Sequence, residues 1–311
     1  MIKVERLTKQ FPGSGGEEFT AVSDLSLSVR PGQIFGFLGP NGAGKTTTIR
    51  MLTSLLVPSS GTAHINGLQV GYQDQAIRQS VGLLSDNPGF YDMLSAEDNL
   101  TFFARLYGVK KPRQQAQRFL QWLDLWNRHG DAVGTFSKGM RQKLGLARAA
   151  MHAPRVLFLD EPTSGLDPDI AKQMRDFMVA MKNEGRTIFL CTHNLDEADR
   201  LCDCVGVFKH HLVAMDSPTN LRRHLFGRES VFCLNRLAGQ WTQLARQLPF
   251  VAEVRAEENR LLVRLENPEE NNPIIIRKLV EAGADIQFVT EVNHTLEEVY
   301  LRLLEKRGAA F

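Results

Sequence analysis

The sequence contains no apolar run that approaches the roughly 18 residues needed to cross a lipid bilayer. Its first residues, Met1–Leu7, alternate apolar and polar side chains as a strand does and do not resemble a secretory signal. Positive and negative charges nearly balance, because the chain has 37 lysines and arginines and 35 acidic residues, which gives a net charge of +2. We therefore expect a cytoplasmic globular protein without a nucleic-acid partner. If it serves transport, another polypeptide supplies the pore.

Cysteine is also scarce, with four residues in 311, and a cytoplasmic setting favours reduced thiols. Cys202 and Cys204, followed by His210 and His211, could be drawn as a metal site, but the spacing is not one that zinc sites commonly use. A buried strand over residues 204–208, with the two histidines in the hairpin after it, is the better interpretation.

A glycine-rich loop is the most informative feature that is present. It comprises Gly39, Pro40, Asn41, Gly42, Ala43, Gly44, Lys45, Thr46 and Thr47, and it matches G-x-x-x-x-G-K-[ST]. Residues 34–38 before it predict a short buried strand, and residues 48–56 after it predict a helix. In this context the loop's N–H groups converge on phosphate oxygens, which the helix N-terminus also attracts. Lys45 can then reach the β- and γ-phosphates, and the Thr46 hydroxyl can ligate Mg²⁺.

A second segment adds the chemistry of hydrolysis. The apolar run Val156–Leu159 predicts a central parallel strand, and it ends in Asp160 and Glu161. Carboxylates at the carboxyl end of such a strand lie in the crevice where open α/β sheets bind ligands. We expect Asp160 to hold Mg²⁺ and Glu161 to polarise the attacking water.

Together with four further segments in the same order, these residues resemble the ATP-binding cassette (ABC) ATPases, over residues 1–218. Phe11 falls where that family stacks an aromatic ring on adenine. Residues 136–142 fall at the family signature, and residues 164–167 at its D-loop. His193 follows an apolar strand, at the position of the family's switch histidine.

The resemblance implies a role for each of these segments. Ser137, Lys138 and Gly139, at the start of a helix over residues 140–150, would bind the γ-phosphate of ATP held by an opposite subunit. Two ATP molecules would then lie between two cassettes, in a homodimer or a heterodimer. Asp167 belongs to the D-loop, and His193 would contact the γ-phosphate and the attacking water.

Two segments depart from the usual family pattern. Lys138 replaces one glycine of the usual signature L-S-G-G-Q, and Met140 replaces its glutamine. The form S-K-G-M resembles that of exporter ATPases whose partners are ABC-2-type permeases. Asp86 stands at the Q-loop position, where the family usually has glutamine.

The predicted fold is α/β: a P-loop NTPase cassette over residues 1–218, with a parallel sheet core, an antiparallel β-subdomain and a helical subdomain at about residues 90–150. Residues 219–311 predict a small α+β accessory domain, with strands at 231–234, 260–265 and 286–292 and a helix at 274–282. Its last helix opens with the capping box Thr295–Glu298. This tail resembles the C-terminal extension of ABC-2-type exporter ATPases.

The predicted function is that of the ATP-hydrolysing subunit of an ABC exporter. Such a subunit uses Mg²⁺ with ATP, pairs with a second cassette, and lies on the inner face of the membrane by docking on a separate permease. One alternative is an importer ATPase with a C-terminal regulatory domain. Another is a soluble cassette ATPase without a transport role. The sequence does not name the cargo, which the permease selects.

Overall fold

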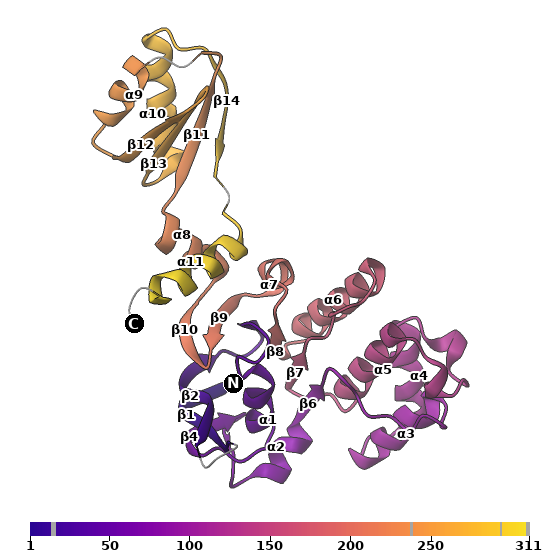
Figure 1. Ribbon diagram of the computed structural model, residues 1–311. Helices are drawn as coiled ribbons and strands as arrows, with labels where there is room; N and C mark the ends of the chain where they lie inside the picture. Colours follow the sequence, from indigo (N-terminus) through magenta and orange to yellow (C-terminus); the bar gives the residue numbers. More distant parts are fainter. Residues whose placement is uncertain (14–16, 237–238, 293, 309–311) are drawn as a thin grey trace. The chain divides into compact units, whose positions relative to one another are not determined.

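The computed structural model describes residues 1–13, 17–236, 239–292 and 294–308 (Figure 1). The chain separates into two compact units, Met1–Ser217 and Pro218–Phe311. Among the described residues, none of the helices is both long and apolar enough to span a bilayer.

The first unit is built on a six-stranded sheet with the strand order β10-β9-β3-β8-β7-β6. Five strands are parallel and the edge strand β10 is antiparallel to β9. The bounds are β3 Ile34–Leu38, β6 Val81–Leu84, β7 Val156–Asp160, β8 Thr187–Thr192, β9 Cys204–Lys209 and β10 His211–Asp216. Every residue of β3, β7 and β8 is buried, as the apolar runs predict for strands covered on both faces.

A second sheet of four antiparallel strands, in the order β2-β1-β4-β5, packs beside the first. Its strands are β1 Ile2–Pro12, β2 Glu18–Val29, β4 Ser60–Ile65 and β5 Leu68–Gln69. The two sheets share one hydrophobic core, in which Phe35, Phe37 and Phe189 contact one another with ring centroids 5.2–6.4 Å apart. The core therefore fixes the position of the loop that follows β3.

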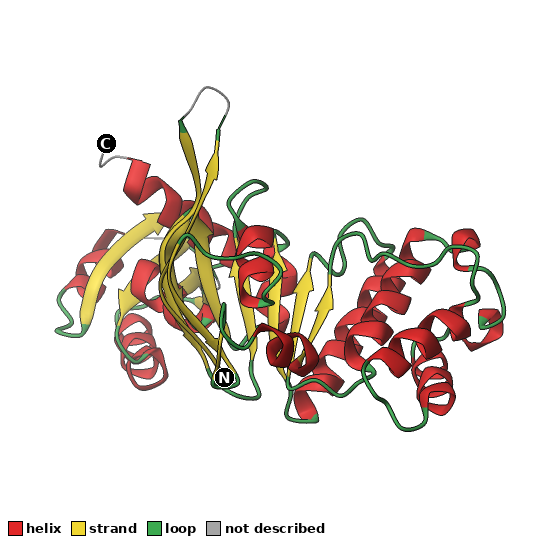
Figure 2. Ribbon diagram, turned by 90° about the horizontal axis from the view of Figure 1, so that it is seen from below, coloured by secondary structure: helices red, strands yellow, loops and turns green. Residues whose placement is uncertain are grey.

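Helices α1 Lys45–Leu52, α2 Asp74–Ser80, α6 Pro168–Asn183 and α7 Leu195–Leu201 connect the strands. A separate helical region contains α3 Ala96–Leu106, α4 Pro112–Trp122 and α5 Lys138–Ala150, with 3₁₀ turns at Trp126–Arg128 and Val133–Thr135. Figure 2 shows these helices gathered at one end of the first unit, beyond the strands. The predicted α/β cassette fold is confirmed by this architecture and by the similar structures described below.

The second unit contains α8 Pro218–Phe226, β11 Glu229–Leu234, α9 Gly239–Arg246, β12 Val251–Glu257, β13 Arg260–Leu265, α10 Pro268–Glu281, β14 Ile286–Glu291 and α11 Leu296–Gly308. The order β11-α9-β12-β13-α10-β14, with the antiparallel sheet order β12-β13-β11-β14, is the split βαβ arrangement of ferredoxin-like folds. Apolar residues from alternate sheet positions pack against α9 and α10.

Four elements of the second unit differ from the sequence prediction. Helices α8 and α9 and strand β12 have no counterpart in it, because their patterns are short and rich in charged and polar residues. Helix α10 begins at Pro268, six residues before the predicted start, and continues through Pro273. Pro268 at the first helical position lacks only an N–H that would have no partner there, so it suits a helix start.

Candidate functional site

The glycine-rich loop lies between the carboxyl end of β3 and the start of α1, as the sequence predicts. Gly44 has φ of +100°, and a Cβ built on it would lie 2.3 Å from the carbonyl oxygen of Ala21. A Cβ on Gly39 would lie 2.2 Å from the carbonyl oxygen of Phe208. Both positions therefore require glycine, because the loop passes within contact of two neighbouring backbone segments.

Lys45 is the first residue of α1, and its side chain is buried. Its Nζ donates hydrogen bonds to the carbonyl oxygens of Gly39 at 2.6 Å and Pro40 at 3.3 Å. It also lies 3.4 Å from Oε1 of Glu161. The ammonium group thus faces the interior of its own loop, where a phosphate would compete with the carbonyls for it.

Thr46 and Asp160 meet at the same end of the parallel sheet. The Thr46 hydroxyl donates to Oδ2 of Asp160 at 2.7 Å. Burial raises the pKa of the Asp160 carboxyl above its ordinary value, the hydrogen bond from Thr46 opposes that shift, and the charges of Glu161 and Asp86 reinforce it. The other oxygen, Oδ1, is buried without a hydrogen-bond partner. A hydroxyl beside an unsatisfied buried carboxylate oxygen fits a hard divalent cation.

Glu161 follows β7 in the left-handed region, with φ of +50°, which is uncommon for a residue other than glycine. Its backbone N–H donates to the carbonyl oxygen of Cys191 at 2.9 Å, which ties the turn to β8. Its Oε2 lies 2.9 Å from Nδ1 of His193, which follows that strand. The backbone therefore brings the predicted base and the predicted switch histidine into contact.

One hollow of about 220 Å³ gathers many of these groups. It is lined by Phe11, Phe19, Ala21, Pro40, Asn41, Gly42, Gly44, Lys45, Thr46, Thr47, Asp160 and Glu161. Phe11 and Phe19 are paired across the β1–β2 hairpin. Sequence reasoning missed Phe19, although its position opposite Phe11 in an alternating hairpin was a usable signal. Part of the loop between them, residues 14–16, lies outside the described residues.

The predicted signature residues do not line this hollow. Ser137 caps α5, and its Oγ accepts a hydrogen bond from the N–H of Met140 at 3.3 Å. The helix begins at Lys138, two residues before the predicted start, because this cap lies at Ser137. A Cβ on Gly139 would lie 2.6 Å from Cδ1 of Ile170, and one on Gly165 would lie 2.9 Å from Nζ of Lys138. The signature thus lies against the segment that contains Asp167, the residue at the N-cap of α6.

Asp86 follows β6, the strand beside β7. Its backbone carbonyl accepts a hydrogen bond from Nε2 of Gln142, a buried residue of α5. Its carboxylate is close enough to help raise the pKa of Asp160. The Q-loop position is therefore joined to the helical region through its backbone while its side chain influences the carboxylate at the end of β7.

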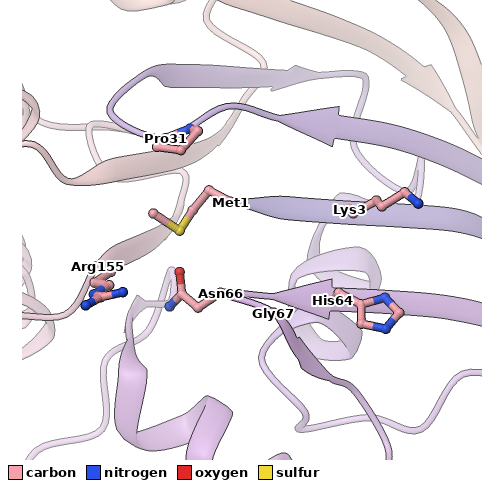
Figure 3. A pocket seen from close by; sticks show the side chains of 7 residues that line it. All are labelled: Met1, Lys3, Pro31, His64, Asn66, Gly67 and Arg155. Carbon is pink, nitrogen blue, oxygen red and sulfur yellow. The ribbon is translucent and has the colours of Figure 1, made fainter.

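A larger hollow of about 590 Å³ lies elsewhere on the first unit, lined by Met1, Lys3, Pro31, His64, Asn66, Gly67 and Arg155 (Figure 3). Pro31 precedes β3 and Arg155 precedes β7, so this hollow is at the amino end of the parallel strands. Ligands of open α/β sheets bind at the carboxyl end. The hollow of about 220 Å³ lies at that carboxyl end, where the glycine-rich loop meets the side chains of Asp160 and Glu161. It is therefore the stronger candidate for the ligand-binding site.

Comparison with known proteins shows the family to which this chain is similar. Residues 22–164 match the ABC transporter family. The chain is 34% identical to the bacitracin transport ATP-binding protein BcrA of Bacillus licheniformis, over 98% of this chain and 97% of that one. It is also 34% identical to the daunorubicin resistance ATP-binding protein DrrA3 of Streptomyces coeruleorubidus, over 91% and 90% of the two chains.

A solved structure of an ATP-binding subunit of an ABC transporter is 28% identical and superposes with a TM-score of 0.66, over 73% of this chain and 94% of that one. The similarity to BcrA extends over nearly the whole of both chains. This chain therefore belongs to the ATP-binding proteins of ABC transporters, and it is an ATPase.

Proposed function

We propose that this chain binds ATP in the hollow beside the glycine-rich loop and hydrolyses it to drive export through a separate membrane permease. The N–H groups of the loop and of the start of α1 would surround the phosphates. The ammonium of Lys45 would move from the carbonyl oxygens of Gly39 and Pro40 onto the β- and γ-phosphate oxygens. This exchange replaces two neutral acceptors with charged ones, which makes stronger hydrogen bonds.

The observation that carries this proposal is the convergence of Lys45, Thr46, Asp160 and Glu161 on one hollow. Thr46 and Asp160 would hold Mg²⁺, which neutralises phosphate charge when bound. Glu161 would accept a proton from the attacking water. His193 would hold the Glu161 carboxylate through the contact at 2.9 Å and meet the γ-phosphate with its exposed side.

We propose further that two copies of the chain complete each site. Ser137, Lys138 and Gly139 lie outside the hollow, at the start of a helix whose first turn contains no acidic residue. Such a helix start attracts an anion. Because every chain carries both the loop and the signature, two antiparallel copies would bind two ATP molecules between them. Asp167 would lie at the same interface.

The permease would dock on the α3 apolar patch, which we define as Tyr91, Met93, Leu94, Phe102 and Leu106. All five side chains are exposed, Met93 at 91% and Leu106 at 67%. Exposed apolar residues that cluster in this way commonly mark an interaction surface. Docking here would place the chain on the cytoplasmic face of the membrane.

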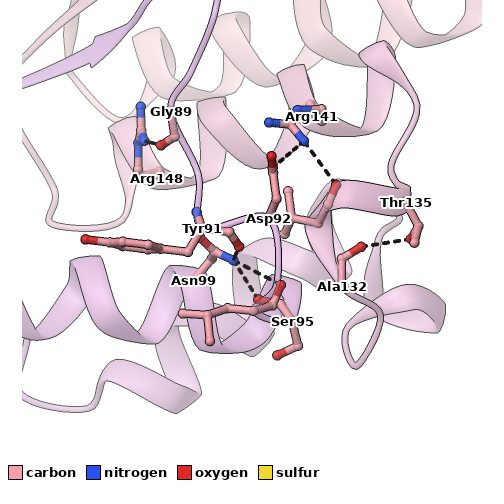
Figure 4. A network of polar contacts seen from close by, with 11 residues as sticks. Gly89, Tyr91, Asp92, Ser95, Asn99, Ala132, Thr135, Arg141 and Arg148 are labelled. Atoms are coloured by element: carbon pink, nitrogen blue, oxygen red, sulfur yellow. Dashed lines mark hydrogen bonds and ion pairs between the residues drawn. The ribbon is translucent and has the colours of Figure 1, made fainter.

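A polar network holds the loop of this patch in place (Figure 4). Buried Asn99 donates to the carbonyl oxygens of Tyr91, Leu94 and Ser95 at 3.0–3.2 Å and accepts from the N–H of Tyr91. Arg141, on the signature helix α5, donates to Asp92 at 2.7 Å. Movement of helix α5 on ATP binding would therefore shift the loop that contains Asp92, through the contact between Arg141 and Asp92.

Export is favoured over import because the two relatives described above are named for bacitracin transport and daunorubicin resistance. A strain that lacks this chain would be tested for growth with antibiotics that include bacitracin and daunorubicin. Wild-type chain is expected to restore tolerance to at least one compound, whereas Glu161→Gln, which keeps the size of the side chain but removes the carboxylate, is not. Restoration by Glu161→Gln would show that hydrolysis does not drive the process.

A further inference from the structure

The turn between helices α3 and α4 of the first unit is rich in positive charge. Residues 99–123 contain five lysines and arginines and no aspartate or glutamate. We call these five residues the basic corner: Arg105, Lys110, Lys111, Arg113 and Arg118. All five are exposed. Their combined charge is larger than the net charge of +2 of the whole chain, so the positive charge is concentrated at this place.

Part of the basic corner lines a hollow of about 610 Å³, to which Lys110, Lys111 and Arg118 contribute. Within the part of the chain that the structure describes, the basic corner has one ion pair, in which Arg118 lies 3.9 Å from Glu184. Glu184 also pairs with Arg186 at 2.8 Å, so its charge is shared between two arginines. The two lysines therefore face the hollow without an acidic partner among the described residues.

These cations suit the phosphate groups of a lipid surface better than a single bound anion. The side chains of Lys110 and Lys111 make no hydrogen bond to other described residues, so nothing holds them in a fixed arrangement around one ligand. A lysine ammonium on a flexible, exposed stem can instead follow headgroups that move in the plane of a bilayer. Clusters of four to eight basic residues next to a membrane commonly bind anionic lipids in this way.

Two exposed apolar residues adjoin the basic corner and favour lipid over nucleic acid. Leu106, at the end of α3, is 67% exposed, and Tyr107 is 41% exposed. Proteins that bind single-stranded nucleic acid stack its bases on free aromatic rings. Leu106 has no ring, and the ring of Tyr107 is already stacked on His152 with centroids 3.9 Å apart. Membrane interfaces accept aliphatic and tyrosine side chains beside lysine and arginine.

We propose that the basic corner binds the anionic lipid headgroups of the membrane beside the permease. The inference rests on the proposed function in one respect: docking of the α3 apolar patch on the permease brings the chain to the membrane. Leu106 belongs to that patch, and the four residues from Leu106 to Lys110 span at most about 14 Å of chain. A chain docked through the patch therefore keeps the basic corner close to the bilayer, where each lysine or arginine strengthens binding roughly fivefold.

Flotation of the full chain with vesicles that contain no permease tests this inference, at low ionic strength and without nucleotide. Vesicles of phosphatidylcholine alone are compared with vesicles that also contain about 30% phosphatidylglycerol, an anionic lipid. The wild type is expected to bind the anionic vesicles at least about fiftyfold more tightly, and about 0.5 M salt should remove that preference. The double variant Lys110→Gln, Lys111→Gln should bind the anionic vesicles roughly 25-fold more weakly than the wild type.

The double variant Arg277→Gln, Lys278→Gln is the matched control, because it removes two positive charges from neighbouring exposed residues of α10. It should bind within about twofold of the wild type, and circular dichroism would check that both variants fold. Equal binding of the wild type to the two kinds of vesicle would overturn the inference, as would equal losses in the two double variants.

A nucleic-acid surface is the other outcome to be tested. Duplex RNA that binds the wild type more tightly than the anionic vesicles do, and that loses affinity when Lys110 and Lys111 are replaced, would also overturn the inference. Because the vesicles contain no permease and no nucleotide is present, none of these results bears on ATP hydrolysis or export. Conversely, a chain that binds anionic vesicles but does not restore antibiotic tolerance would leave this inference standing and remove the proposed function.

Discussion

Thr46 and Asp160 are 114 residues apart in the sequence, and the Thr46 hydroxyl donates to Oδ2 of Asp160 at 2.7 Å. The hydrogen bond joins the start of α1 to the end of β7 and leaves Oδ1 of Asp160 buried without a partner. Burial also raises the pKa of this carboxyl, so it carries its charge at an energetic cost. A divalent cation would offset that cost.

The first prediction concerns this pair. Asp160→Asn is expected to weaken Mg²⁺ affinity roughly 10–100-fold in the presence of ATP, as losses of metal-supporting groups commonly do. Thr46→Ser, which keeps the hydroxyl, is the control and should bind Mg²⁺ nearly as the wild type does. The Mg²⁺ affinity of both variants is measured by titrating Mg²⁺ in the presence of a fluorescent ATP analogue. An Asp160→Asn variant with unchanged Mg²⁺ dependence would remove this carboxylate from the metal site.

The second prediction concerns adenine. Phe11→Ala is expected to weaken ATP binding by about 1–3 kcal/mol, the range for one base stacked on an aromatic ring. Phe11→Tyr, which keeps the ring, should retain most of the affinity. Inorganic tripolyphosphate has no base, so it should bind the wild type and both variants equally. If tripolyphosphate loses as much affinity as ATP in Phe11→Ala, the ring supports the loop rather than the base.

Much of this fold followed from the sequence because the motifs carry their own structural requirements. A glycine-rich loop needs a strand before it and a helix after it, and the run at 156–159 has the composition of a strand buried on both faces. Phe19 was missed because no motif contains it. The signal for it is indirect, since it reaches the hollow through its pairing with Phe11 across the hairpin.

Other features depend on contacts that local pattern does not reveal. The contact of Glu161 with His193 arises because β7 and β8 are neighbours in the sheet, which the order of elements alone does not determine. In the tail, β12 presents charged residues to solvent along an edge and therefore lacks the alternation that signals a strand. Helix α10 contains Pro273, which sequence reasoning treats as a boundary.

The third prediction concerns the α3 apolar patch. Leu106→Asp is expected to leave ATP hydrolysis by the isolated chain near the wild-type rate, because Leu106 does not line the nucleotide hollow. It should reduce the amount of chain retained on membranes that contain the permease. Tyr72→Asp is the control, since Tyr72 is 82% exposed and outside the patch. Equal retention of both variants would place the docking surface elsewhere.

The fourth prediction concerns pH. His152 stacks on Tyr107 with ring centroids 3.9 Å apart, its Nε2 lies 3.0 Å from the carbonyl oxygen of Val81, and its Nδ1 is buried without a partner. Burial lowers the pKa of His152 from 6.5 to about 4. Between these values the unfolded chain binds a proton that the folded chain does not, so stability is lost as the pH falls through this window.

The loss amounts to about 2–3 kcal/mol of unfolding free energy at pH 4.5. His152→Gln keeps a side-chain N–H donor but does not titrate. Urea unfolding at pH 7.5 and pH 4.5 should therefore show a smaller acid-induced loss in the variant than in the wild type. An identical loss in the two proteins would mean that His152 has the same pKa in the folded and unfolded chains.

The central claim, that each ATP site combines the loop of one copy with the signature of another, is tested most directly by mixing two inactive variants. Lys45→Ala removes the phosphate-binding ammonium, and Gly139→Asp places a negative charge where the γ-phosphate would bind. Each variant alone is expected to hydrolyse ATP at a small fraction of the wild-type rate. In an equimolar mixture, half of the dimers are mixed and each contains one intact site, so roughly a quarter of the wild-type activity should return. A mixture no more active than its two components would contradict the account.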